Sequence, residues 1–144
     1  MRAIVFGSDH AGFGLKNVLM EHLSGRFEII DVGVHSLESC DYPVMAGKLA
    51  VEVLRIKAMG ILICGSGIGV SITANRFEGI RAALCTNEYM ARMSRMHNDA
   101  NVLCMGERIL GVDLAKAITD AFLDTEFEAG RHQRRVDLID RQTA

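Results

Sequence analysis

The chain has 144 residues, a length typical of one compact domain with one hydrophobic core. Apolar residues make up 49% of it, which excludes a disordered protein, and a net charge of −2 provides no overall attraction to nucleic acid or membrane. We expect one domain over residues 1–144, with no nucleic-acid or membrane partner. Met1 is followed almost at once by a strand-like run, so we expect no signal peptide and a cytoplasmic protein.

Apolar runs typical of strands alternate with helical stretches along the whole chain. The expected strands cover residues 2–7, 27–33, 60–64, 80–85 and 101–106. The expected helices cover residues 12–23, 43–57, 68–76, 87–96 and 110–123, with a final charged helix over 131–141. Continuous apolar runs are typical of parallel strands covered on both faces. The pattern predicts an α/β fold: a three-layer, Rossmann-like, doubly wound sheet of five parallel strands in the order 2-1-3-4-5, with a C-terminal helix.

Ligands of such sheets bind beyond the carboxyl ends of the strands, which directs attention to the loop after the third strand. That loop consists of Gly65, Ser66, Gly67, Ile68 and Gly69, and it leads into a helix. Free backbone N–H groups and a helix N-terminus suit an anion such as a phosphate or an enediolate. The glycine spacing matches neither a dinucleotide fingerprint nor a P-loop.

Four cysteines are present, and none of them forms a C-x-x-C pair, so we expect reduced thiols and no zinc site. Cys64 ends the third strand just before the glycine loop, where a helix N-terminus favours a thiolate. It is a candidate base for removing a proton beside a carbonyl. The alternative, a small buried hydrophobic residue, fits Cys85 and Cys104 better, and Cys40 lies in a polar loop.

Three further groups of polar residues admit both a structural and a functional interpretation. Ser8 or Asp9 is expected to cap the first helix, and Asp9 and His10 also face the predicted pocket. His97 follows the fourth helix, where a histidine usually caps the helix end. Its loop lies at the amino edge of the sheet, so a catalytic His97 would serve the pocket of a second subunit. Arg131 and Arg135 share a helix face and suit either a phosphate clamp or a solvated surface.

Taken together, these motifs resemble type B ribose-5-phosphate isomerases of the ribose/galactose phosphate isomerase family. The matching segments, in the order of the chain, are residues 7–13, 15–16, 41–43, 60–69, 79–82, 97–103, 126–128 and 130–132, with Arg135. The resemblance implies an aldose–ketose isomerase for ribose 5-phosphate and ribulose 5-phosphate that needs no metal and no cofactor. It also implies a homodimer, or a dimer of dimers, with active sites shared between subunits.

The resemblance also implies roles for individual residues. Cys64 would move a proton between C1 and C2, the loop 65–69 would hold the enediolate, and the Ser66 hydroxyl would assist transfer between the oxygens. His97 would open the sugar ring, and Asp9 and Asn98 would bind the sugar. The residues expected around the phosphate are His10, Arg108, Arg131 and Arg135. Many members of the family have threonine where this chain has Ser66; the hydroxyl is kept, but the methyl group that restricts its rotamer is absent.

Other functions are compatible with parts of the pattern. The same fold and chemistry serve hexose 6-phosphates such as allose or galactose 6-phosphate, and pocket depth decides between pentose and hexose. A non-catalytic phosphate or nucleotide sensor would use the glycine loop alone, leaving Cys64, His97 and Asp9 without a shared purpose. A flavodoxin-like electron carrier is disfavoured because aromatic residues make up only 6% of the chain.

Overall fold

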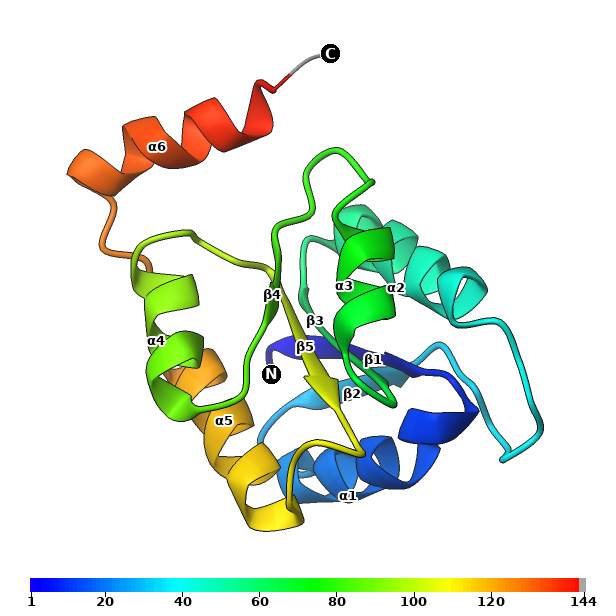
Figure 1. Cartoon of the computed structure of the whole chain (residues 1–144). Helices are drawn as coiled ribbons and strands as arrows, with labels where there is room; N and C mark the ends of the chain where they lie inside the picture. Colours follow the sequence, from blue (N-terminus) through cyan, green and yellow to red (C-terminus); the bar gives the residue numbers. More distant parts are fainter. Residues whose placement is uncertain (143–144) are drawn as a thin grey trace.

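The computed structural model describes residues 1–142, in which five strands form one parallel sheet (Figure 1). The strands are β1 (Ala3–Ser8), β2 (Glu28–Asp31), β3 (Met59–Cys64), β4 (Ala82–Leu84) and β5 (Val102–Gly106). The helices are the 3-10 turn η1 (His10–Gly12), α1 (Phe13–Leu23), α2 (Tyr42–Ile56), α3 (Ile68–Ala74), α4 (Glu88–Met96), α5 (Val112–Asp124) and α6 (Arg131–Asp140). The expected alternation of strands and helices is confirmed.

The sheet is covered on both faces, as its apolar runs predict. In β3, Ile61 and Ile63 pack into a core with α1, α4 and α5, while Leu62 and Cys64 pack into a second core with α2 and α3. Successive side chains of a strand point to opposite faces, so a central strand with helices on both sides must be apolar at every position. The architecture is therefore the three-layer α/β arrangement that was expected.

The expected strand order is wrong in one respect. The observed order is β2-β1-β3-β5-β4, so β5 lies between β3 and β4 and the two last strands are exchanged. All five residues of β5 are buried, whereas the three residues of β4 are only partly buried. A central position buries more apolar surface, so it stabilises the longer strand β5 more than the short strand β4. The short β4 is better suited to the edge of the sheet, where one side of a strand has no hydrogen-bonding partner.

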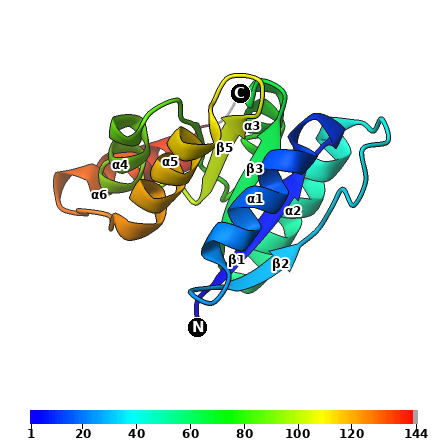
Figure 2. The ribbon, with the colours of Figure 1, turned by 90° about the horizontal axis from the view of Figure 1, so that it is seen from below.

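The C-terminal helix α6 extends away from the sheet (Figure 1). From below, α4, α5 and α6 are grouped beside β5, away from β2 (Figure 2). Arg81 holds α6 to the body of the domain, because its guanidinium lies 3.0 Å from a carboxylate oxygen of Asp140 and 3.3 Å from one of Asp99. Within residues 1–142, no helix combines the length and the apolar character that a membrane span requires.

Candidate functional site

The carboxyl end of β3 places a thiol beside the glycine loop. Cys64 is the last residue of the strand, and its side chain is buried. The backbone N–H of Gly67 donates a hydrogen bond to Cys64 Sγ, at an N–S distance of 3.1 Å. This hydrogen bond fixes the sulfur atom of Cys64 beside the glycine loop.

The glycine loop leaves several backbone donors available. Within the part of the chain that the structure describes, the N–H groups of Gly65, Ser66 and Gly69 donate to no protein group. The N–H of Ile68 donates to Ser66 Oγ, which leaves the hydroxyl proton of this exposed serine free. Unpaired N–H groups at the start of a helix form a ready cradle for an anion.

Close packing explains why this loop needs glycine. Gly67 has a φ of 80°, and a Cβ atom there would lie 2.8 Å from the carbonyl carbon of Met105. At Gly65, a Cβ atom would lie 3.1 Å from an Arg108 guanidinium nitrogen, and the N–H of Arg108 donates to the Gly65 carbonyl. The loop is thus pressed against the end of β5, and Arg108 lies directly beside it.

Asp9 and His10 reach the same edge of the sheet from the end of β1. Asp9 is buried, its N–H donates to the Ile63 carbonyl, and its Oδ1 accepts from the Gly12 N–H at 3.1 Å. The expected N-cap is therefore Asp9 and not Ser8. His10 Nδ1 accepts the N–H of Cys40 at 3.2 Å, so a neutral His10 ring carries its proton on Nε2 and can donate it to a ligand.

The remaining predicted site residues lie at the opposite edge. His97 is the C-cap of α4 and Asn98 follows it. Both precede the amino end of β5. Arg131 and Arg135 are exposed on α6, which adjoins this region. The structure therefore brings Asp9, His10, Cys64, the loop 65–69 and Arg108 together. It places His97, Asn98, Arg131 and Arg135 in a second group, which confirms the sidedness expected for His97.

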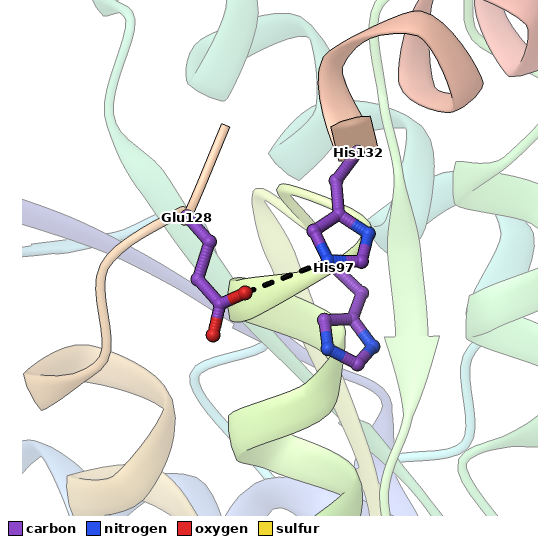
Figure 3. Close-up of side chains that lie close together, drawn as sticks. All are labelled: His97, Glu128 and His132. Carbon is purple, nitrogen blue, oxygen red and sulfur yellow. Dashed lines mark ion pairs between the residues drawn. The ribbon is translucent and has the colours of Figure 1, made fainter. Parts of the chain in front are cut away.

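Two residues that received no role from the sequence surround His97. The rings of His97 and His132 are stacked, with centroids 4.2 Å apart and 16° between their planes. Glu128 Oε2 lies 3.5 Å from His132 Nε2 (Figure 3). Burial, followed by the nearby His97 and Arg131, lowers the pKa of His132 below its usual value, while Glu128 opposes this shift. The i, i+4 spacing of Glu128 and His132 was the available signal, but their proximity to His97 depends on how α6 docks.

Comparison with known proteins places the chain in a family. The model of the family described as Ribose/Galactose Isomerase matches residues 4–139. Ribose-5-phosphate isomerase B of Escherichia coli (strain K12) is 50% identical over 141 residues, covering 96% of this chain and 95% of that protein.

Solved structures agree with this result. Ribose-5-phosphate isomerase B of Clostridium thermocellum superposes with a TM-score of 0.94 at 52% identity, covering 96% of this chain and 95% of that one. The enzyme of Mycoplasma genitalium, solved with bound ribulose 5-phosphate, superposes with a TM-score of 0.93 at 41% identity. That match covers 96% of this chain and 94% of the other.

Proposed function

This chain belongs to the Ribose/Galactose Isomerase family, and on that premise we propose that it interconverts ribose 5-phosphate and ribulose 5-phosphate with Cys64 as the base. The observation that supports this most is the position of the thiol. Cys64 Sγ accepts a hydrogen bond from the Gly67 N–H, and it adjoins a loop in which, within residues 1–142, the backbone N–H groups of Gly65, Ser66 and Gly69 are unpaired. A base beside preorganised donors is what removal of a proton next to a carbonyl requires.

In the proposed reaction, the Cys64 thiolate takes the proton from C2 of the open-chain aldose. The electron pair of the broken C–H bond forms the enediolate, whose negative charge is stabilised by the N–H groups of Gly65, Ser66 and Gly69. The Ser66 hydroxyl passes a proton between the two oxygens. Cys64 then returns its proton to C1, which gives the ketose and restores the thiolate.

The proposed substrate spans both groups of residues. Asp9 binds the sugar, His10 and Arg108 approach the phosphate, and all three lie at the edge that carries Cys64. Ring opening by His97, sugar contact by Asn98 and phosphate binding by Arg131 and Arg135 require the opposite edge of another subunit. We therefore include a dimer, or a dimer of dimers, with shared sites in the proposal. A cavity of about 950 Å³ between α6 and residues 75–83, lined in part by Asn98, leaves open space at the edge that a partner would cover.

The deciding experiment is a turnover assay on purified protein with ribose 5-phosphate, allose 6-phosphate and galactose 6-phosphate. We expect kcat/KM to be highest for ribose 5-phosphate. A higher value for either hexose phosphate would favour the hexose alternative, and no turnover of any of the three would contradict the proposal. Cys64→Ala protein, prepared in the same way, controls for a contaminating isomerase.

A further inference from the structure

We propose that His97, Glu128 and His132 form a binding site for a divalent metal ion that, like Zn²⁺, prefers nitrogen ligands. A metal bound there inhibits the enzyme because it occupies the side chain of His97. The inhibitory effect rests on the function proposed above for His97. The binding site itself does not, because it follows from the arrangement of the three side chains.

The backbone holds the three residues in one place from two separate segments. The N–H of Glu128 donates to the Met96 carbonyl at 3.1 Å, which fixes the segment before α6 against the end of α4. His132 lies in the first turn of α6, four residues after Glu128, and its ring stacks on His97 (Figure 3). One nitrogen of each ring and one carboxylate oxygen lie within 4.8 Å of one another.

Two imidazole nitrogens and one carboxylate oxygen are a ligand set that Zn²⁺ accepts, with a fourth position left for water. With metal–ligand distances of about 2.0–2.2 Å, ligand atoms around a tetrahedral ion are about 3.4 Å apart. The three ligand atoms must therefore move closer together when a metal binds. The two stacked rings must also tilt away from parallel, because a metal lies in the plane of each imidazole that binds it. Side-chain rotation supplies this movement, since Glu128 is exposed and His97 is partly exposed.

The charges around the cluster determine which metal it selects. Each imidazole binds a metal through the lone pair of a ring nitrogen, and His97 and His132 supply one such nitrogen each. The positive charges of Arg131 and Arg135 also lie near His132, and they disfavour the binding of a cation that is held by charge attraction alone. Binding must come from bonds to nitrogen, which favours Zn²⁺ over Mg²⁺ or Ca²⁺, since these hard ions depend on several oxygen ligands.

Calorimetric titration of EDTA-treated and dialysed protein with ZnCl₂ tests the site directly. We expect saturable binding of about one ion per chain, and no binding of MgCl₂. His132→Gln and the more conservative Glu128→Gln should each weaken Zn²⁺ binding, the first by at least about tenfold. Glu128 is exposed, so Glu128→Gln keeps the test valid if His132→Gln does not fold.

Two control variants identify the ligands. His22 pairs with Asp120 at 3.0 Å in a different part of the molecule, so His22→Gln should bind Zn²⁺ as the wild type does. Cys64→Ala should also bind normally, because the thiol is not part of the cluster. The proposed site would be overturned by absence of saturable binding, by wild-type affinity for Zn²⁺ in both His132→Gln and Glu128→Gln, or by loss of binding in Cys64→Ala.

The effect on turnover is measured separately, in the isomerase assay with increasing ZnCl₂. We expect inhibition that EDTA reverses, and a clearly higher half-inhibitory concentration for Glu128→Gln. An unchanged half-inhibitory concentration in that variant would overturn inhibition through this cluster. If the protein turns over no sugar phosphate, the proposed function fails while calorimetry still decides the metal site; if it is active but binds no Zn²⁺, only the metal site fails.

Discussion

At the scale of single residues, the surroundings of each cysteine separate the candidate base from the structural thiols. Burial raises the pKa of the Cys85 thiol to about 11 and the pKa of the Cys104 thiol well above its usual value. Both therefore remain protonated at neutral pH and cannot act as a base there. Within residues 1–142, Cys64 is the one buried thiol that accepts a hydrogen bond from a backbone N–H and adjoins the glycine loop.

Replacing Cys64 with alanine is expected to reduce kcat by about 10² to 10⁴, because a general base is lost, while the fold is retained. Stopped assays of aldose–ketose conversion and a circular dichroism spectrum measure the two effects. Cys85→Ala is the matched control: it removes a buried thiol of the core cluster and should keep turnover near that of the wild type. Near-normal activity in folded Cys64→Ala would remove Cys64 from the mechanism.

Removal of metal ions is expected not to lower turnover. In the proposed reaction, the N–H groups of Gly65, Ser66 and Gly69 stabilise the negative charge of the enediolate, so no step needs a Lewis acid. The measurement is kcat/KM before and after exhaustive EDTA treatment and dialysis. Activity that disappears and returns only when a divalent ion is added back would show that the loop is not sufficient.

At the scale of elements, η1 is pressed onto the end of β3, and this contact positions Asp9 next to Cys64. A Cβ atom at Gly12 would collide with the backbone carbonyl of Ile63. The same carbonyl accepts the N–H of Asp9. Because the obstacle is backbone and not a flexible side chain, relief requires that η1 move away from the sheet, and Asp9 would move with it.

Gly12→Ala is therefore expected to lower the free energy of unfolding by about 1–3 kcal/mol, the usual cost of overpacking a dense interior. Urea denaturation monitored by circular dichroism measures this change. Gly111→Ala is the matched control: among residues 1–142, a Cβ atom at Gly111 would meet no atom within 4 Å beyond its chain neighbours, and its φ of −73° suits any residue. Equal stability of the two variants would mean that η1 is not held as closely as the structure indicates.

The helix α6 presents Arg131 and Arg135 one turn apart on an exposed face. If they bind the phosphate, replacing either with alanine should chiefly raise KM. A smaller fall in kcat is also expected, because remote binding energy helps to orient the reacting carbons. Arg134, exposed on the same helix, is the control, and Arg134→Ala should leave KM unchanged. Unaltered kinetics in the Arg131→Ala, Arg135→Ala double variant would identify both as ordinary surface residues.

At the scale of the whole molecule, the parallel sheet separates the two groups of site residues. Cys64 and Asp9 follow carboxyl ends of strands, whereas His97 precedes the amino end of β5. A strand of five residues spans about 17 Å, which is too far for one side chain to cross. A two-fold partner can present its own His97 to the Cys64 edge, and symmetry then generates two equal sites.

Mixing two inactive proteins tests this arrangement. Cys64→Ala and His97→Ala, exchanged at random, should form heterodimers in which one site carries both defects and the other carries neither. Activity should return to at most about a quarter of the wild-type value. Each variant taken alone through the same exchange procedure is the control. Proven heterodimers without activity would mean that His97 and Cys64 act within one chain.

The sequence by itself determined the features that depend on local pattern. Apolar runs and their alternation with helical stretches predicted every strand and every α-helix of residues 1–142 to within a few residues, but not the short turn η1. Side-chain periodicity is set by the element that contains it. The glycine loop after a buried strand likewise predicted free backbone N–H groups at the start of a helix, since its neighbours in the chain are also its neighbours in space. The direction of parallel strands was enough to place His97 opposite Cys64.

Only the tertiary structure decided which distant segments meet. The position of β5 between β3 and β4 depends on competition between strands for two-sided pairing, which is decided only when the strands meet in the sheet. The stacking of His132 on His97 depends on the docking of α6 against the end of α4. Both are contacts between segments far apart in the chain, whose free energy comes from burial and pairing that exist only once the whole domain has folded.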